Sequence, residues 1–441
     1  MLYNKLLNGK NYQATINKKR YFFLLMFVLC LGYTLSQFLR TSIGVLAPEL
    51  MNNVNLSHEN MGFLGGVFFL SFALFQIPSG ILLDRFGPRR VMSIVILLAF
   101  LGSVIFAMSD SYQGLLIARI FMGLGCSICL MGSLVLITMW APSNFSILAG
   151  TILAIGGLGG LLATTPLSIL SELHGWRSAF WISASITFLI AILYYFIIRD
   201  RPSVLSKDKI NKSKDNANIL KVIKQRDFKF MVPMSLMSYS ALVVVLGLWG
   251  APYLKDVQGL NVVERGQVLM LMAISWNIGS FIFGYLNRIL GGYKRVVIFG
   301  AIGTILCLIV LSFIPELEKE FLYIFFCIFG FFGAFSVALL AHYQSLHDKE
   351  NMGKALTTAN FFNFGGVFLM QWISGKIIYY VNGGLLIASK QSYICAFIFV
   401  AFCLFIALII YMFSNEEKIA TYLEFFSTAS LYARGKKNFQ N

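Results

Sequence analysis

Long apolar runs alternate with short polar segments along almost the whole chain. Each run holds roughly 20 residues or more, which is what a helix needs to cross the ~30 Å hydrocarbon core of a bilayer. We predict twelve spans, at 21–48, 61–83, 91–109, 112–138, 146–170, 177–198, 229–252, 263–285, 296–314, 321–344, 355–381 and 391–413. Backbone groups in lipid must be satisfied internally, and the roughly ten-residue alternating segments of a transmembrane barrel do not occur in this sequence. The pattern therefore predicts an all-α polytopic membrane protein.

Composition agrees with this class, and the placement of charge adds an orientation. Hydrophobic residues make up 58% of the chain and charged residues 12%, against about 25% charged in soluble domains. Of the 35 lysines and arginines, 27 fall on one side of the predicted membrane and five on the other. The richer side holds 1–20, 84–90, 199–229, 286–295, 345–354 and 414–441. Cytoplasmic segments carry such an excess, so we expect a plasma (inner) membrane protein with both termini inside.

The same topology accounts for the net charge of +16, so no nucleic-acid partner is expected. The basic N-terminus resembles a signal peptide, but no small-residue cleavage site follows, which favours an uncleaved first span. Cys126 and Cys129 form a C-x-x-C inside an apolar run without acidic or histidine neighbours. Such cysteines are more often packing residues than redox or metal ligands. We therefore expect no metal and no cofactor.

The chain divides into two similar halves. The polar stretch 199–228 separates six spans from six, and the stretches SGILLDRFGPRRV (79–91) and GYLNRILGGYKRV (284–296) each follow the second span of a half. We predict a cytoplasmic N-terminal segment, two six-helix bundles, a linker between them and a cytoplasmic tail. Their boundaries are 1–20, 21–198, 199–228, 229–413 and 414–441. Parallel repeats of six spans related by a pseudo-twofold axis are typical of secondary transporters.

At these residues the chain resembles the major facilitator superfamily, over nearly its whole length. GILLDRFGPRR (80–90) resembles the family's signature loop G-x-x-x-D-R-x-G-R-[KR], and LIARIFMGLG (116–125) is similar to its fourth-span R-x-x-x-G-x-G element. The resemblance implies a major facilitator fold in which this loop latches the two halves in the outward-open state. The expected latch residues are Gly80, Asp84, Arg85, Gly87, Arg89, Arg90, Asn287 and Arg288.

The chemistry of the loop can also be argued from its residues. Gly80 removes a side chain where a neighbouring helix is expected to pass closely. Asp84 can cap a helix or pair with a basic residue in one conformational state. In the second half Asn287 replaces the acid, so a latch there lacks the charge. A turn that only sets topology is the alternative, although it would not require Gly80, Asp84 and Gly87.

Three cations lie within the predicted spans: Arg40, Arg119 and Lys376. All acidic residues fall in loops or at span ends, so we expect no carboxylate partner for them. At ~1.5 Å per residue, Arg40 and Arg119 would lie ~12 Å and Lys376 ~10 Å from the outer surface. Intramembrane cations without partners favour an anionic substrate. The alternatives are snorkelling to the interface and, for Arg119 and Lys376, a structural role.

Arg40 is the strongest candidate for substrate contact. Tyr33, Gln37 and Arg40 fall at i, i+4 and i+7, on one polar face of the first span. The context FLRTSIGVLAPEL (38–50) resembles span one of family members that move organic anions, including sugar acids and organophosphates, in which an arginine here faces the substrate. The organophosphate members carry a matching arginine in span seven, which this chain lacks. That difference favours a monocarboxylate or a zwitterion.

Neutral polar residues complete the predicted cavity. Tyr239 and Trp249 of span seven offer hydrogen bonds and a stacking surface. Asn360, Asn363 and Gln371 lie in span eleven, with Asn360 and Asn363 on one face at i and i+3. The full set of expected substrate-binding residues is Tyr33, Gln37, Arg40, Arg119, Tyr239, Trp249, Asn360, Asn363, Gln371 and Lys376.

We therefore predict a secondary active transporter, not an enzyme, that carries a small organic anion by rocker-switch alternating access in the bilayer. The nearest alternative is a transporter of amino acids, peptides, or drug- or siderophore-like compounds, with Arg40 structural. A sensor on this fold is disfavoured by the intact signature loop, and a channel by the lack of a pore motif. Coupling to a proton or to exchange stays open, since only His342 of the four histidines lies within a predicted span. We expect a monomer.

Overall fold

The computed structural model describes residues 2–200, 226–314, 316–346, 349–385 and 387–415, and every regular element in this part of the chain is a helix. The first half holds α1 (Leu2–Val54), α2 (His58–Phe86), α3 (Pro88–Met108), α4 (Tyr112–Trp140), η1 (Pro142–Asn144), α5 (Phe145–Leu162), α6 (Thr165–His174) and α7 (Trp176–Ile197). The second half holds α10 (Arg226–Ser238), α11 (Ser240–Val244), η2 (Val245–Trp249), α12 (Gly250–Asp256), α13 (Val262–Leu290), α14 (Tyr293–Phe313), α15 (Lys319–Gly333), α16 (Phe335–Ser345), α17 (Lys349–Val381) and α18 (Lys390–Tyr411).

Each predicted span coincides with a helix or with a run of consecutive helices. Eleven helical stretches in the described part of the chain are long and apolar enough to cross a membrane, and α17, with 33 residues, is the remaining long helix. Three spans are interrupted: α5 gives way to α6, α10 to α12 form one irregular span around the π-helical turn η2, and α15 gives way to α16. Pro166 in the first turn of α6 lacks the N–H that would continue α5.

The two halves repeat each other in helix length as well as in sequence. α2 and α13 both contain 29 residues, and α3 and α14 both contain 21. Gly87 ends α2 with φ +80°, and Gly291 ends α13 with φ +73°, a region that favours glycine. The expected all-α fold of two six-helix bundles is confirmed.

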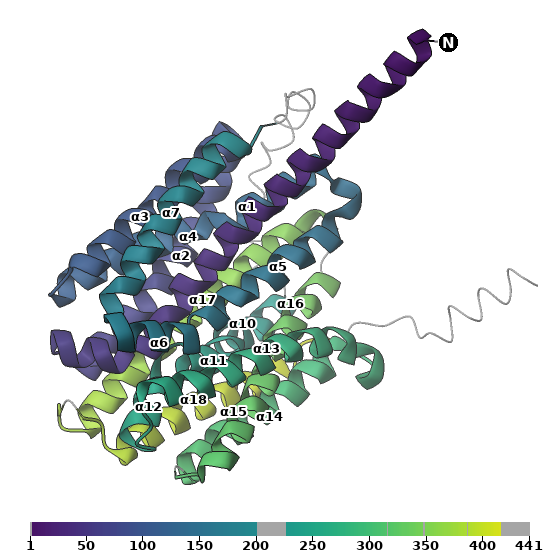
Figure 1. Cartoon of the computed structure of the whole chain (residues 1–441). Coiled ribbons are helices and arrows are strands. Elements are labelled where there is room, and N and C mark those ends of the chain that lie inside the picture. The colour runs from purple at the N-terminus through teal and green to yellow at the C-terminus, as the bar shows by residue number, and fades with distance from the viewer. Residues whose placement is uncertain (1, 201–225, 315, 347–348, 386, 416–441) are drawn as a thin grey trace, which may run out of the picture.

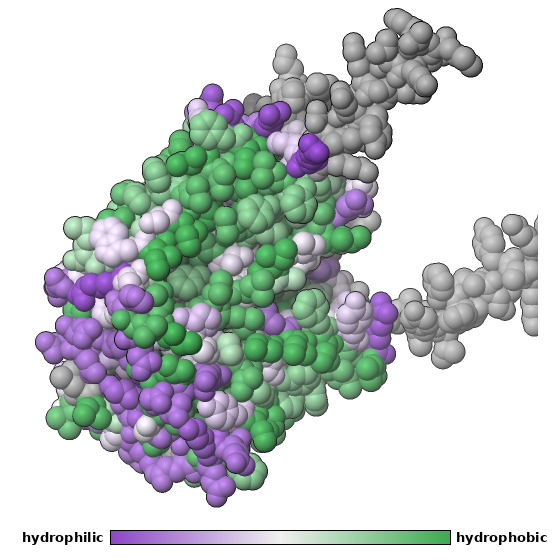
Figure 2. Space-filling model, viewed as in Figure 1, coloured by the Kyte–Doolittle hydropathy of each residue, from purple (hydrophilic) through white to green (hydrophobic). Residues whose placement is uncertain are grey.

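The helices α1 to α7 gather on one side of the molecule and α10 to α18 on the other (Figure 1), and α17 packs against α2 across the interface. On the visible surface a hydrophobic belt separates two hydrophilic ends, as expected of a protein that crosses a bilayer (Figure 2). We call the end at which α1 joins α2 the α1–α2 face, and the opposite end the α2–α3 face.

The bundles pack most tightly toward the α1–α2 face. A Cβ atom on Gly44 of α1 would lie 2.5 Å from the carbonyl carbon of Gly247 in η2. A Cβ atom on Gly62 of α2 would lie 2.5 Å from the carbonyl oxygen of Gln371 in α17. Only glycine allows backbones to approach so closely, so these contacts close the interface at this end.

Parts of the predicted domain division fall outside the described residues. These are residues 201–225 of the linker, 416–441 of the tail and residue 1. The helix α1 begins at Leu2, within the predicted N-terminal segment, and runs without a break to Val54.

Candidate functional site

A cavity of about 380 Å³ lies between the two bundles. Its walls come from α1 and α5 on one side and from α13, α16 and α17 on the other. The polar or hydrogen-bonding side chains in its lining are Tyr33, Gln37, Arg40, Tyr239, Trp276, Asn277, Ser280, Ser336, Asn360 and Asn363. A smaller pocket of about 30 Å³ shares Gln37, Arg40 and Trp276 with this cavity and reaches Gly247. Arg40 therefore lies where the cavity meets the smaller pocket.

Arg40 is buried between one aromatic ring from each bundle. Its guanidinium carbon lies 4.8 Å from the ring centre of Phe72 in α2 and 5.0 Å from that of Phe364 in α17. Such contacts offset part of the cost of burying a cation. Within the described residues Arg40 has no hydrogen-bond or ion-pair partner, and its Nε is buried. The cavity is thus lined by a guanidinium whose charge the described part of the protein does not neutralise.

Arg40 lies farther from the end of its helix than the predicted span implies. α1 does not end at Pro48 but continues to Val54. The distance from Arg40 to the end of the helix is therefore ~21 Å at 1.5 Å per residue. Pro48 is accommodated inside the helix, and the expected depth of ~12 Å below the membrane surface stays a prediction.

Arg119 of α4 is fully buried and does not line the cavity. Its guanidinium nitrogens donate to three backbone carbonyls: Nη1 to Leu39 at 2.8 Å, Nη2 to Gly65 at 3.2 Å and Nε to Leu64 at 3.4 Å. The guanidinium carbon also lies 4.6 Å from the ring centre of Phe68. These contacts tie α4 to α1 and α2 and leave no nitrogen directed at a substrate.

Lys376 has a carboxylate partner, contrary to the expectation for the three intramembrane cations. Its Nζ lies 3.5 Å from Oε1 of Glu59, which is in the first turn of α2, in the other bundle. It also lies 4.5 Å from the ring centre of Trp372. The prediction failed because Glu59 falls at a span end in the sequence but faces α17 in the fold. Lys376 belongs to the α1–α2 face rather than to the cavity.

Of the remaining expected residues, the structure brings five to the cavity and places two elsewhere. Those in the lining are Tyr33, Gln37, Tyr239, Asn360 and Asn363. Trp249 is buried and donates from Nε1 to Oγ of Ser374 at 2.8 Å. Gln371 is buried and donates to the carbonyl oxygen of Val243 at 3.3 Å. Both therefore hold helices of the second bundle together.

Four polar residues that were not predicted also line the cavity: Trp276, Asn277 and Ser280 of α13, and Ser336 of α16. Nε1 of Trp276 is buried without an acceptor in the described part of the chain, and the ring lies 6.1 Å from that of Tyr239. Across from them, Oε1 of Gln37 is buried and equally without a donor. The signal in the sequence was the polar pair Trp-Asn inside an apolar run, at the middle of span eight.

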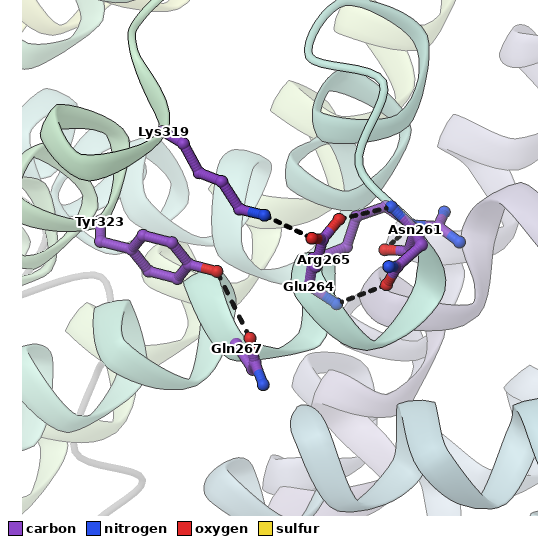
Figure 3. A network of polar contacts seen from close by, with 6 residues as sticks. All are labelled: Asn261, Glu264, Arg265, Gln267, Lys319 and Tyr323. Atoms are coloured by element: carbon purple, nitrogen blue, oxygen red, sulfur yellow. Dashed lines mark hydrogen bonds and ion pairs between the residues drawn. The ribbon is translucent and has the colours of Figure 1, made fainter.

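On the α1–α2 face an ion pair joins the bundles. Nη2 of Arg265, at the start of α13, lies 2.7 Å from Oε1 of Glu49 in α1, and the Arg265 side chain is 3% exposed. Asn261 caps α13 and exchanges hydrogen bonds with Glu264, which Lys319 also contacts, while Tyr323 donates to Gln267 (Figure 3). This network fixes the helix end from which Arg265 reaches the other bundle.

Among the described residues, the expected latch loop makes its polar contacts with the first bundle and with Asp200, just after α7. The backbone N–H of Arg89 donates to Oδ1 of Asp200 at 3.0 Å, and its Nε donates to the carbonyl of Tyr195 at 2.8 Å. Asp84 is exposed and forms no ion pair with a described residue. A Cβ atom on Gly80 would meet only Sδ of Met131, at 3.8 Å, so the close helix passage expected there is not present.

Other expected latch residues contact neighbours on their own helix or at its end. Arg85 lies 5.2 Å from the ring centre of Phe86, and Arg288 lies 5.6 Å from that of Tyr285. The carbonyl of Asn287 accepts the N–H groups of Gly291 and Gly292 at the end of α13. Arg90 is exposed at the start of α3.

Comparison with known proteins places this architecture in a family. The family model of the Major Facilitator Superfamily matches residues 29–371. The chain is 23% identical over 385 residues to the membrane sensor protein UhpC of Escherichia coli strain K12, covering 80% of this chain and 85% of that protein. It is 23% identical over 280 residues to the probable sulfoacetate transporter SauU of Cupriavidus necator, covering 61% and 65%. It is 21% identical over 260 residues to the hexuronate transporter of Bacillus subtilis, covering 58% and 60%.

Solved structures show the same fold. A D-xylose-proton symporter superposes with a TM-score of 0.71 at 19% identity, covering 90% of this chain and 99% of that one. A bacterial homologue of the human lysosomal transporter Spinster, in an inward-facing and occupied conformation, superposes with a TM-score of 0.72 at 19% identity, covering 89% and 97%. The chain is thus a multi-pass membrane protein with the same helical fold as these transporters.

Proposed function

Because the chain belongs to the Major Facilitator Superfamily, we propose that it is a transporter that moves a small organic anion through the cavity between its bundles. One observation carries this proposal: Arg40 is buried where it lines the cavity, without a counter-charge in the described residues. A guanidinium in low dielectric binds a carboxylate or sulfonate through two parallel charge-assisted hydrogen bonds. The substrate would supply the missing negative charge.

The other groups in the cavity favour a monoanion with neutral polar groups. Arg40 is the single cation among the lining residues in the described part of the chain. Gln37, Asn277 and Asn360 offer amides, and Trp276 and Tyr239 offer ring surfaces on the opposite wall. Relatives named as transporters of hexuronate and sulfoacetate match at low identity, and both of those compounds are organic acids. A sugar acid fits this combination better than a doubly charged phosphate ester.

The proposal includes an orientation and a transport cycle. We place the α2–α3 face and both termini on the cytoplasmic side of the inner membrane, because the basic residues concentrate on that side. The bundles 21–198 and 229–413 would rock about the site, with 199–228 as the linker. The conformation described here is closed on the outer, α1–α2 face. The loop at 80–90 and Asn287–Arg288 would latch the bundles in the opposite state.

The test is transport by the purified full-length protein in proteoliposomes. We expect counterflow of glucuronate that exceeds that of glucose 6-phosphate. Arg40→Ala should lower transport about a hundredfold, since two charge-assisted hydrogen bonds contribute about 3 kcal/mol, while Arg40→Lys should keep part of the activity. Melting temperatures near that of wild type control for folding. Normal transport by Arg40→Ala would refute the role of Arg40.

A second candidate is a membrane sensor of a small anion. Two relatives, from Escherichia coli and Salmonella typhimurium, are named membrane sensor protein UhpC, and each match covers 80% of this chain. The same Arg40 site would then bind a ligand without moving it. Ligand-dependent stabilisation that is lost in Arg40→Ala, together with no flux or counterflow of the same ligand, would favour the sensor.

A further inference from the structure

His58, the first residue of α2, is a buried titratable side chain outside the anion site. It is 1% exposed, and neither ring nitrogen has a hydrogen-bond partner among the described residues. It lies just before the predicted second span, 61–83, and α2 begins at His58 itself. A buried imidazole without partners is costly, so its position calls for an explanation.

The surroundings of His58 join the two bundles. Its ring centre lies 6.0 Å from that of Trp249 in η2, and a Cβ atom on Gly375 of α17 would lie 2.6 Å from its carbonyl oxygen. α2 belongs to the first bundle, whereas η2 and α17 belong to the second. His58 is therefore buried only while the α1–α2 face is closed, because separation of α2 from α17 would expose it to water.

The closed interface disfavours a charged imidazolium. The described residues provide no acceptor for a second ring N–H, and burial penalises the cation. The position at the N-terminus of α2 adds the positive end of the helix dipole. The helices around His58 carry these charged and titratable groups at the α1–α2 face: Glu49, Glu59, Tyr112, Tyr253, Lys255, Asp256, Arg265, Lys376, Tyr379 and Tyr380. Of the two carboxylates closest to the interface, Glu59 faces Lys376 and Glu49 faces Arg265.

We propose that His58 is a proton-binding site that controls closure of the α1–α2 face. The face closes around the neutral imidazole and is held open when His58 binds a proton. Because the open state binds that proton more tightly, lower pH shifts the equilibrium toward the open state. An exposed histidine side chain has a pKa of about 6.5, so the population of the open state should rise as the pH falls through that value. This inference concerns the conformational equilibrium and does not depend on the identity of the substrate.

Hydrogen exchange of the purified full-length protein tests this proposal without any substrate. Backbone amides of 58–66 and 368–376 flank the interface on its two sides, and their exchange is compared at about pH 5 and about pH 8 after correction for intrinsic rates. In wild type we expect several-fold faster exchange at the lower pH. His58→Gln, neutral at both pH values, should remove the pH effect. His174→Gln changes an exposed histidine on the same face and should retain it.

Two results would overturn the proposal. One is a pH response that survives in His58→Gln, and the other is the lack of any pH response in wild type. His58→Asn serves as a second neutral variant of smaller volume, and melting temperatures at about pH 8 establish that the variants fold.

Discussion

Arg40 and Arg119 are two arginines buried in the same bundle, but their surroundings differ in every respect that matters for function. Arg119 donates to three backbone carbonyls of α1 and α2. Arg40 faces a cavity, touches a ring from each bundle and has no polar partner among the described residues. Because one of the carbonyls that Arg119 contacts belongs to Leu39, the two guanidinium groups lie at similar depth. Depth in the membrane therefore does not separate a structural cation from a binding cation, whereas the satisfaction of its donors does.

The largest expected difference between the two arginines is in stability. Arg119→Ala removes three hydrogen bonds that connect α4 to two other helices and leaves a cavity, so it should lower the free energy of unfolding by about 3 kcal/mol. Arg40→Ala removes a cation that the described residues do not neutralise and should leave the melting temperature unchanged or higher. Thermal denaturation of both variants in one detergent measures this. Equal losses of stability would contradict the assignment of the two roles.

A smaller effect would show whether the site of Arg40 extends to the second bundle. Trp276→Phe keeps an aromatic ring in the cavity but removes a donor that has no acceptor in the described protein. Binding of a hydroxylated anion should weaken about tenfold, since one hydrogen bond contributes about 1.4 kcal/mol, with no loss of stability. Isothermal titration with glucuronate measures the change.

Trp249→Phe is the matched control for this prediction. It removes the same donor from a tryptophan that bonds to Ser374 outside the cavity. We expect a lower melting temperature and unchanged affinity. The reverse pattern, with affinity lost in Trp249→Phe and kept in Trp276→Phe, would place the substrate elsewhere.

The smallest effect is expected from Lys376, which the sequence grouped with the two arginines. Its ion pair with Glu59 is partly exposed, with side chains 38% and 31% accessible, so Lys376→Gln should cost no more than about 1 kcal/mol. The ion pair of Arg265 with Glu49 is more deeply buried. Glu49→Gln should therefore open the α1–α2 face more than Lys376→Gln does. The hydrogen-exchange rate of the backbone amides of 58–66 measures this opening in both variants. Faster exchange in Lys376→Gln than in Glu49→Gln would contradict the prediction.

Several features of the fold and site were predictable because their signals are local. Apolar runs of spanning length gave the helices, and the periodicity of Tyr33, Gln37 and Arg40 placed them on one face of α1. The ends of the helices were less predictable. α1 runs past Pro48 to Val54, and α2 starts at His58, before the predicted start of its span at 61.

The sequence by itself determined the class of protein, the repeat of its halves and the face of α1 that carries Arg40, because hydropathy and helical periodicity act between residues a few positions apart. The tertiary structure alone decided which charges find partners. Arg265 meets Glu49 across 216 residues and Arg119 meets the Leu39 carbonyl across 80, distances at which no local pattern specifies contact. The physical reason is that the cost of a buried charge depends on its surroundings, and packing of the bundles creates those surroundings.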